Sequence, residues 1–462
     1  MSKSTDFSKT IYALATALGT GSIAVIRLSG PEAINIASRI FHGKNLQQVK
    51  TNTVHFGKIG GSDRTCDQVL VSVFRAPHSY TGENYIEISS HANLFVVDDV
   101  MRILSEQGAV AAGPGEFTLR SFLNGKQDLA QAEAVASLIQ AKSRTGAKNS
   151  LAQLNGELSN KIWTIRNDLI DIIGLMEIDL DFSEEELPVV SGEELVSKLR
   201  AVDTAISSLI GSFNYGRLLK DGINLAIIGE TNVGKSTLLN QLLGENRAIT
   251  SHIPGTTRDT IQEALIIHDI LFNLVDTAGL RETGNRIESE GITRTRAQIE
   301  RADLVLLVVD GSRKLSERSL ALIKQTIGTV KGKTILVSNK QDLGKHRMSQ
   351  NLLQALGLPL VCLSARQGDG IDRLHEIIFQ EVSAGMDIFS DQLIITSERQ
   401  FDILRQVKID LNTAIKLLQN HGGFEFAALD LRQALENLGQ ISGETATDDI
   451  LNHVFANFCI GK

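Results

Sequence analysis

"INLAIIGETNVGKSTLL", residues 223–239, is the stretch that decides the fold. Apolar residues typical of a buried strand lead into Gly229-x-x-x-x-Gly234-Lys235-Ser236, and residues typical of a helix follow. Glycines allow successive backbone N–H groups to surround a phosphate, Lys235 reaches the β- and γ-oxygens of a nucleotide, and Ser236 ligates Mg²⁺. Because a strand and a helix flank the loop as this chemistry requires, the sequence predicts a phosphate-binding loop.

The same alternation of strand-like and helix-like segments continues around this loop, from about residue 220 to residue 383. Short apolar runs alternate with helical segments, which is typical of a doubly wound α/β domain. The strand candidates are "INLAIIG", "EALIIHDI", "LFNLVD", "LVLLVVD", "TILVSNK" and "LVCLSA".

Two of these strands end in residues that suit a guanine base. After "SNKQD", the Asp342 carboxylate offers two acceptor oxygens to the adjacent N–H donors of guanine, a pair that adenine lacks. Asn339 and Lys340 would support the loop and cover the base. "LSAR" places Ser364, Ala365 and Arg366 where a backbone amide can meet the guanine carbonyl. The sequence therefore predicts a GTP site.

Two further motifs suit the terminal phosphate. In Asp276-Thr-Ala-Gly279, Asp276 can hold the water shell of the metal and the Gly279 amide can meet the γ-phosphate. In "TSHIPGTTRD", a threonine completes the Mg²⁺ coordination, with Thr257 preferred and Thr256 the alternative. The predicted GTP-binding residues are Asn232, Val233, Gly234, Lys235, Ser236, Thr237, Ser251, His252, Ile253, Pro254, Gly255, Thr256, Thr257, Asp276, Thr277, Ala278, Gly279, Asn339, Lys340, Asp342, Ser364, Ala365 and Arg366.

Leu280 stands where Ras-like proteins carry a glutamine that orients the attacking water. Asn232, together with backbone carbonyls of Ser251 and Ile253, could hold a potassium ion that neutralises developing charge; the alternative is that Asn232 only shapes the loop. Glu282 could orient the water, or could be a solvated loop carboxylate.

Composition indicates a cytoplasmic protein of two or three domains. The chain has 462 residues, of which 42% are hydrophobic, and carries a net charge of −8, which argues against coating nucleic acid by bulk electrostatics. The longest apolar run, "LVLLVV", is too short for a membrane span, and "MSKSTDFSKT" is not a secretory signal. The cysteines Cys66, Cys362 and Cys459 form no paired motif, which favours a reducing compartment.

The chain is expected to form an N-terminal α+β domain (1–124), a first helical part (125–218), the α/β domain (219–383) and a second helical part (384–462). Leu151, Leu154 and Leu158 begin an apolar stripe that continues to Met176 and predicts one long amphipathic helix. Ser191 and Glu194 form a plausible capping box for a helix through Leu209. Helices before and after the α/β unit favour a helical domain with the α/β domain inserted in it.

The chain resembles the MnmE (TrmE) family of tRNA modification GTPases nearly end to end, and four stretches outside the nucleotide motifs carry the resemblance. They are "GSIAVIRLSG", "SYTGENYIEISSH", "PGEFTLRSFLNGKQDLAQAEAV" and "ISGETATDDILNHVFANFCIGK". The resemblance implies a multidomain α/β plus α fold, with an N-terminal α+β folate-binding domain, a helical domain and an inserted Ras-like G domain. It also implies a homodimer formed through the N-terminal domain, and the ligand 5-formyltetrahydrofolate as a one-carbon source.

The resemblance further implies the roles of individual residues. Folate contacts would be Arg27, Glu87, Lys126 and the terminal Lys462; for Arg27 and Lys126 alone, plain surface solvation is the alternative. Potassium would be bound through Asn232, Ser251, Ile253 and Thr256, and Glu282 would be needed for hydrolysis. Cys459 would lie near the folate site, as a nucleophile or substrate contact, or as a small buried residue on the last helix.

The implied activity is potassium-stimulated GTP hydrolysis that drives a tRNA modification. With MnmG, an FAD-containing partner in a heterotetramer, the family adds an aminomethyl or carboxymethylaminomethyl group to C5 of the wobble uridine. The alternative is a ribosome-assembly switch of the Era or Der type, although no second phosphate loop or Gly-x-x-Gly module is seen after residue 383. A third possibility is that the N-terminal domain serves only for dimerisation.

Overall fold

The computed structural model describes residues 8–17, 19, 21–61, 65–181, 190–246, 263–275, 302–329, 332–383, 393–420, 423–456 and 458–461. The chain forms two compact units. The first contains residues 1–140, 150–207 and 402–462, and the second contains residues 141–149 and 208–401. Within the described ranges, no helix is long and apolar enough to cross a membrane. The predicted domain boundaries stay predictions.

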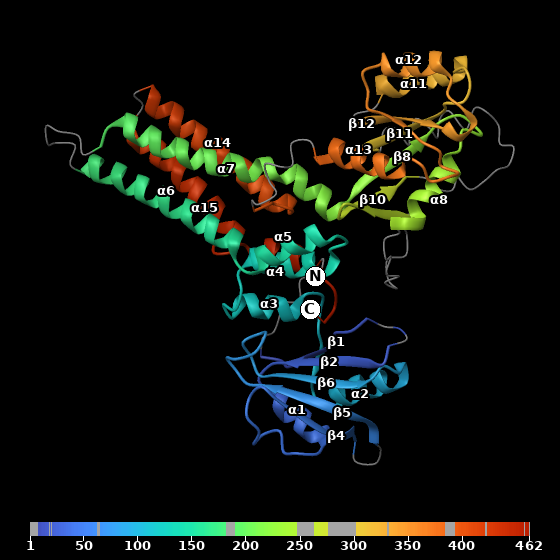
Figure 1. The fold of residues 1–462 in the computed structure, drawn as a ribbon. Coiled ribbons are helices and arrows are strands. Elements are labelled where there is room, and N and C mark those ends of the chain that lie inside the picture. The colour runs from blue at the N-terminus through green and yellow to red at the C-terminus, as the bar shows by residue number, and fades with distance from the viewer. Residues whose placement is uncertain are drawn as a thin grey trace. The chain divides into compact units, whose positions relative to one another are not determined.

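The first unit begins with a seven-stranded sheet in the order β3-β4-β5-β6-β2-β1-β7. Neighbouring strands are antiparallel except for β1 and β7. Helices α1 and α2 pack on one face of this sheet (Figure 1). The elements are β1 Ile11–Leu14, β2 Ile23–Ser29, α1 Ala33–Ile40, β3 Phe41–His42, β4 Thr53–Gly60, β5 Thr65–Phe74, β6 Tyr85–His91, α2 Leu94–Glu106 and β7 Val110–Ala111.

Alternation of side chains explains how this sheet buries one face. In β2, Ala24, Ile26 and Leu28 are buried against the two helices, while Ile23 is exposed. On the other face, Phe56 of β4 and Leu70 of β5 are exposed and directly paired. The strands predicted from "SIAVIRLSG", "QVLVSVFRA" and "YIEISSHA" are therefore present.

Helices from both ends of the chain complete the first unit. Helix α6 packs against α15, and α3 packs against α16, so segments far apart in the sequence share one core. Three helices, α5, α7 and α14, contribute residues to both units. The helices are α3 Glu116–Leu123, α4 Leu129–Gln140, α5 Arg144–Leu154, α6 Glu157–Asp181, α7 Gly192–Asp221, α14 Glu398–Gln419, α15 Phe424–Ser442 and α16 Asp448–Ala456.

The single long helix predicted from the apolar stripe is wrong, because the helix breaks after Leu154. Gly156 has φ +88°, a left-handed conformation that ends α5 before α6 begins. Leu158 and later members of the stripe are buried, whereas Leu151 is exposed. The predicted cap at Ser191 is present, since its hydroxyl accepts a hydrogen bond from the Glu194 amide at 3.2 Å. Helix α7 extends beyond the predicted Leu209.

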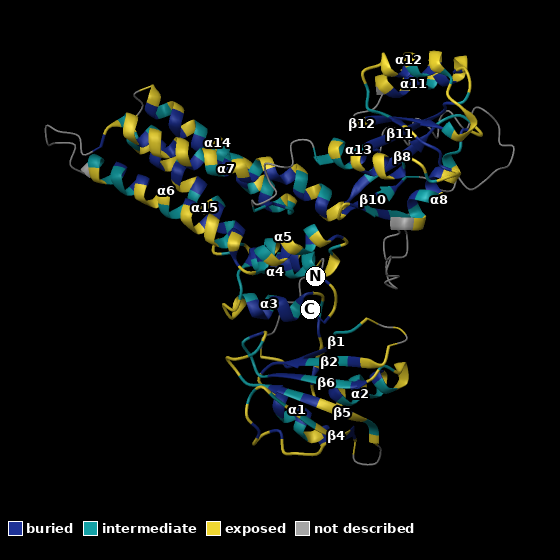
Figure 2. Ribbon diagram, viewed as in Figure 1, coloured by how far each residue is buried: buried dark blue, intermediate teal, exposed yellow. Residues whose placement is uncertain are grey.

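The second unit contains a six-stranded sheet in the order β13-β12-β11-β8-β10-β9, with only β9 antiparallel. Helices α8 and α13 pack on one face, and α11 and α12 on the other. All residues of β11 are buried (Figure 2). The elements are β8 Ile223–Ile228, α8 Lys235–Asn246, β9 Ala264–Ile267, β10 Ile270–Leu274, β11 Leu304–Asp310, α11 Glu317–Thr329, β12 Lys333–Asn339, the short η1 Gln341–Leu343, α12 Arg347–Gln354, β13 Leu360–Cys362 and α13 Ile371–Ser383.

This arrangement confirms the predicted doubly wound fold, with one local correction. "EALIIHDI" is not strand to its end, because His268 and Asp269 have φ +46° and +62° and turn the chain between β9 and β10. A two-residue hairpin turn of type I′ has positive φ at both central positions, and histidine and aspartate tolerate this better than most residues.

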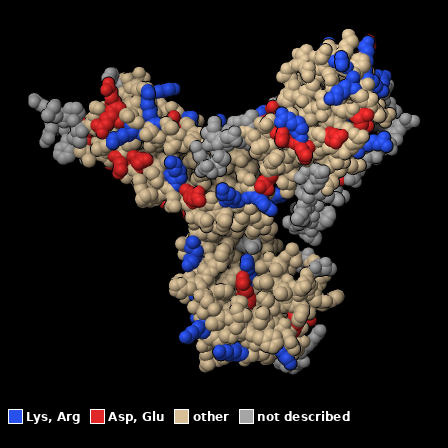
Figure 3. Space-filling view, viewed as in Figure 1, with Lys and Arg blue, Asp and Glu red and all other residues tan. Residues whose placement is uncertain are grey.

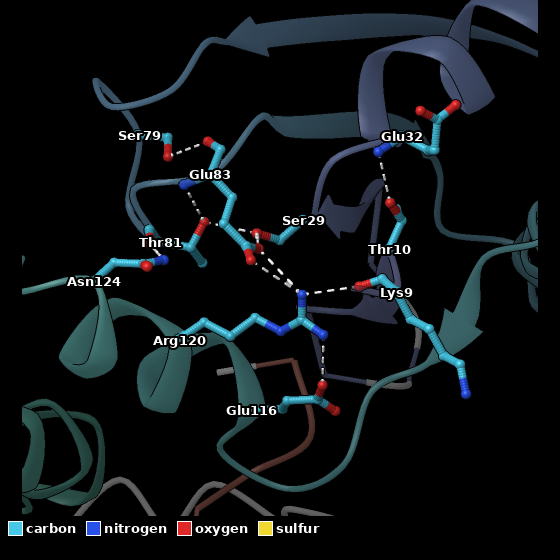
Figure 4. Close-up of polar contacts among 10 residues, drawn as sticks. All are labelled: Lys9, Thr10, Ser29, Glu32, Ser79, Thr81, Glu83, Glu116, Arg120 and Asn124. Atoms are coloured by element: carbon cyan, nitrogen blue, oxygen red, sulfur yellow. Dashed lines mark hydrogen bonds and ion pairs between the residues drawn. The ribbon is translucent and has the colours of Figure 1, made fainter. Parts of the chain in front are cut away.

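A buried ion cluster fastens the N-terminal sheet to α3 (Figure 4). The Arg120 side chain is 0% exposed. One terminal nitrogen donates to the Lys9 carbonyl at 2.9 Å and to both Glu83 oxygens at 3.2 Å, and the other donates to Glu116 at 2.9 Å. Glu83 also accepts a hydrogen bond from the Ser29 hydroxyl at 2.6 Å. Two carboxylates therefore compensate one buried guanidinium.

Arg120→Met should strongly destabilise the first unit, because it leaves two partly buried carboxylates without their cation. We expect a loss of about 3–5 kcal/mol in the free energy of unfolding, measured by urea titration. Arg102→Met is the matched control, since Arg102 is exposed and pairs with Asp99 on the surface, and it should cost about 0–1 kcal/mol. Equal unfolding midpoints for the two variants would contradict a structural role for the cluster.

Candidate guanine-nucleotide and N-terminal sites

The loop between β8 and α8 has the backbone that phosphate binding requires. Asn232 and Gly234 have φ +64° and +98°, left-handed conformations with which the loop turns before α8 begins. The loop follows β8, whose neighbours β10 and β11 lie on opposite sides of it. Ligands of open α/β sheets bind at such a switch point, beyond the carboxyl ends of the strands.

Close packing explains why both loop glycines are needed. A Cβ atom on Gly229 would lie 2.3 Å from the Val308 carbonyl oxygen, and one on Gly234 would lie 2.3 Å from the Asn339 amide nitrogen. No side chain fits at these distances. The loop is therefore held directly against the ends of the neighbouring strands.

The predicted phosphate-binding lysine lies across this loop. The Lys235 ammonium donates to the carbonyls of Gly229 and Glu230 at 2.9 Å and 2.7 Å. Burial lowers the pKa of Lys235, and the nearby Glu230 carboxylate counteracts part of that effect. Asn232, Ser236 and Thr237 are exposed around it, whereas Val233 is buried in the core beneath.

Asn339 joins three loops through its buried carboxamide. Its amide nitrogen donates to the Val233 carbonyl at 2.8 Å, and its oxygen accepts a hydrogen bond from the Ala365 amide at 2.9 Å. The side chain itself lies at the end of β12 and is 2% exposed. The Asn339 side chain thus brings together the phosphate-binding loop, the "SNKQD" loop and the "LSAR" loop.

Asp310 belongs to the same region and was missed by sequence reasoning. It ends β11, in register with Asn339, and its carboxylate accepts a hydrogen bond from the Lys340 ammonium at 2.9 Å. Burial raises the pKa of Asp310, but hydrogen bonds from Ser312 and Lys340 outweigh this effect and hold it below the ordinary value. A lone carboxylate at the end of an otherwise apolar strand was the available signal.

The residues expected to read the base are also neighbours. The Asp342 carboxylate is exposed and accepts a hydrogen bond from the Ser364 hydroxyl at 2.7 Å. Ser364 and Ala365 are buried, while Arg366 is exposed. Asp342 therefore presents oxygen atoms to solvent from a loop that Ser364 holds in place.

Several predicted residues lie outside the described residues. They are Ser251, His252, Ile253, Pro254, Gly255, Thr256, Thr257, Asp276, Thr277, Ala278, Gly279, Glu282 and Lys462. Their roles in binding Mg²⁺, potassium, the γ-phosphate, the attacking water and folate stay predictions.

A second polar site lies on the N-terminal sheet, where Arg27 and Glu87 are cross-strand partners on β2 and β6. The Arg27 guanidinium donates to the Glu87 carboxylate at 3.0 Å and to the Gly461 carbonyl at 3.1 Å. Tyr85 donates to the same Glu87 oxygen at 3.3 Å, and burial, the largest effect, raises the pKa of Tyr85. With its side chain only 20% exposed, Arg27 is not a merely solvated surface residue.

The other N-terminal candidates lie less centrally. Lys126 is exposed, and its ammonium donates to the Pro77 carbonyl at 3.1 Å; among the described residues it makes no ion pair with Glu87. The C-terminal tail passes α3, because Ile460 forms a β-bridge with Pro114. Cys459 is exposed and lies beyond the end of α16, so the expectation of a buried residue on the last helix is wrong.

Comparison with known proteins gives the family. A family model described as the MnmE helical domain matches residues 129–459, and one described as the GTP-binding protein TrmE N-terminus matches residues 10–126. A tRNA modification GTPase MnmE of Cytophaga hutchinsonii is 39% identical over 458 residues, which cover 99% of each chain. This chain belongs to the MnmE family of tRNA modification GTPases.

A second full-length relative agrees with this assignment. The MnmE protein of Lactobacillus acidophilus is 36% identical over 460 residues, again covering 99% of each chain. Among solved structures, the G domain of the T. maritima FeoB iron transporter is 28% identical and covers 35% of this chain and 98% of that chain, with a TM-score of 0.26. The MnmE assignment rests on the full-length relatives and the family models.

Removal of the Asn339 side chain should disconnect the three loops of the second unit. Asn339→Ala leaves the Val233 carbonyl and the Ala365 amide unsatisfied, at a cost of about 1–3 kcal/mol each, and should weaken GTP binding. Asn339→Asp keeps the acceptor and loses the donor, so it should fall between Asn339→Ala and wild type. Urea unfolding and nucleotide titration measure both effects.

Asn351→Ala is the control for this series, because Asn351 is exposed on α12. If Asn339→Ala were as stable as Asn351→Ala and bound GTP equally well, the side chain would not hold the site together.

Proposed function

We propose that this GTPase binds Mg²⁺·GTP at the carboxyl edge of its six-stranded sheet and hydrolyses it with a potassium ion and Glu282. The observation that carries this proposal is the joint at Asn339, which brings a phosphate-binding loop, an Asn-Lys-x-Asp loop and a Ser-Ala-Arg loop to one place. Asp342 would accept the guanine N–H donors, and Lys340 would cover the base.

The Mg²⁺ ion would be held by Ser236 and Thr257. Ser236 fits this role, since it is an exposed hydroxyl in the first turn of α8. A metal ion held there would neutralise negative charge on the phosphates of the nucleotide. Asp276 would hold the water shell of the metal.

A potassium ion would be held by Asn232 with Ser251, Ile253 and Thr256. Asn232 suits the role because it is exposed, its backbone has φ +64°, and its carboxamide offers a neutral oxygen atom. A monovalent cation there supplies positive charge next to the β- and γ-phosphates. Leu280 cannot orient water, so that task would fall to Glu282.

GTP turnover should rise strongly in KCl compared with NaCl at equal ionic strength, because sodium is too small for a site built for potassium. Glu282→Ala should keep GTP affinity and lose turnover, whereas Glu317→Ala, at an exposed position of α11, should keep both. Steady-state phosphate release and nucleotide titration measure the two quantities. Equal rates in both salts would remove the cation from the proposal.

The N-terminal site would hold 5-formyltetrahydrofolate as the one-carbon source. Arg27, Lys126 and Lys462 suit the glutamate carboxylates of a folate, and Glu87 suits the N–H groups of its pterin. The fit rests on the partly buried Arg27–Glu87 pair, whose exposed fractions are 20% and 28% and which lies beside the C-terminal Gly461. Cys459, two residues earlier, would contact the substrate or act as a nucleophile.

Isothermal calorimetry with 5-formyltetrahydrofolate should show binding by wild type and strongly reduced binding by Arg27→Ala, because the variant removes the cation and releases the tail. Lys44→Ala, at an exposed position of the same unit, should bind like wild type. No heat from the wild-type protein would mean that the N-terminal domain serves only for dimerisation.

The chain would act as a homodimer with the FAD-containing MnmG, and would modify C5 of the wobble uridine of tRNA. An exposed apolar strip on the open face of the N-terminal sheet, formed by Val54, Phe56 and Leu70, supports dimerisation there. Full-length similarity to tRNA modification GTPases favours this function over an Era- or Der-type assembly switch.

Deletion of the gene should remove the C5 group from wobble uridines, as measured by nucleoside analysis of total tRNA. Wild-type protein should restore the group, and Glu282→Ala should not, because hydrolysis is needed. Restoration by Cys459→Ser would limit Cys459 to substrate contact or packing. Unchanged wobble uridines in the deletion strain would favour the assembly switch.

A further inference from the structure

Exposed basic side chains lie on α11 and α12 of the second unit and in the residues just before these helices. In residues 312–329 and 343–357 six side chains are basic and one, Glu317, is acidic, although the whole chain has a net charge of −8. Lys and Arg side chains gather over these two helices in Figure 3. We call this surface the basic α11–α12 face; its exposed members are Arg313, Lys314, Arg318, Lys324, Lys345 and Arg347.

The two helices hold this face in a fixed form. Ile323 of α11 and Leu353 of α12 are both buried in the core on one side of the sheet. Buried Ser349 of α12 accepts a hydrogen bond from the Leu315 amide at 3.1 Å and donates to the Arg313 carbonyl at 3.2 Å. Arg318, Lys324 and Arg347 therefore extend from helices packed on the core. Arg313, Lys314 and Lys345 lie in the residues just before these helices.

The charge pattern fits a polyanion better than a protein. Protein interfaces are depleted in lysine and balance their charges, whereas three of the six basic residues here are lysines. The acids that oppose them are Glu317 and Asp310, which pairs with Arg313. Exposed apolar residues such as Met348 and Leu352 lie between them. Single exposed apolar side chains are ordinary on protein surfaces, and no aromatic residue is present in these segments to stack a base.

We propose that the basic α11–α12 face binds the phosphate backbone of tRNA, without reading its sequence. The inference rests on the proposed function, in which tRNA is the substrate, and assigns one surface that holds it. Charge complementarity carries it, because each phosphate neutralised by a lysine or arginine releases condensed counterions. The contact positions the RNA and leaves recognition of the wobble base to other surfaces.

The test measures, by fluorescence anisotropy, how tightly the full-length protein binds an unmodified tRNA transcript in about 50–200 mM NaCl. Sodium is used because potassium is a proposed ligand of the nucleotide site. The variant Lys314→Gln/Lys324→Gln/Arg347→Gln should bind about tenfold or more weakly at the lowest salt. Its slope of log affinity against log salt should be shallower by about 2–3. Arg313 is left unchanged, since it also pairs with Asp310 at 3.3 Å.

The matched control is Lys44→Gln/Lys50→Gln/Lys58→Gln, which removes the same charge from exposed positions of the first unit and should keep the wild-type slope. GTP turnover should be the same in all three proteins. The proposal would be overturned if wild type and the α11–α12 variant had equal slopes, or if the control lost as much tRNA affinity as that variant. It would also be overturned if wild-type protein showed no salt-dependent binding of tRNA. If the α11–α12 variant bound tRNA normally but no longer assembled with MnmG, the face would dock a protein instead. In every such case, retained wobble modification in cells would leave the proposed function standing.

Discussion

The buried carboxamide of Asn339 is the interaction on which the nucleotide site depends. Parallel strands bring their carboxyl ends to one edge of a sheet, but this alone leaves the following loops independent. Asn339 removes that independence, because it donates to Val233 and accepts from Ala365. Gly234 has to be glycine for the same reason, since the Asn339 side chain occupies the space a Cβ atom would need. The loops for phosphate binding and for base recognition are thus both held by the Asn339 side chain.

The first unit depends on a comparable interaction, the buried ion cluster around Arg120. This cluster explains in physical terms the family motif "PGEFTLRSFLNGK". In "PGEFTLRSFLNGK", Glu116 and Arg120 belong to the buried ion cluster with Glu83. This cluster connects α3, the loop before β6 and the residues preceding β1. The motif therefore shapes the domain, while Arg27 and Glu87, on neighbouring strands of the sheet, offer their polar groups to a ligand.

Local patterns in the sequence predicted the strands, the phosphate-binding loop and the doubly wound fold, because each of these depends on residues close together in the chain. The break at Gly156 was missed, since leucines on either side keep helical spacing and only the backbone conformation shows the interruption. The partnership of Asp310 with Lys340 was also missed, because two strands had to be aligned before the residues could meet. Cys459 is exposed because α16 ends before it, at Ala456. The contact between the Gly461 carbonyl and Arg27 also joins residues that are far apart in the chain. Thr257, Asp276 and Glu282 lie outside the described residues, and their roles stay predictions.

The central claim is that a guanine nucleotide lies at this edge with Asp342 reading its base, and nucleotide selectivity of Asp342→Asn tests it most directly. Asparagine keeps an oxygen that can accept the Ser364 hydroxyl bond, but it replaces one guanine-facing acceptor with a donor. Xanthine carries a carbonyl where guanine carries its amino group, so competition binding should show a switch from GTP to xanthosine triphosphate. A variant that still prefers GTP, or a wild-type protein that binds ATP as tightly as GTP, would contradict the account.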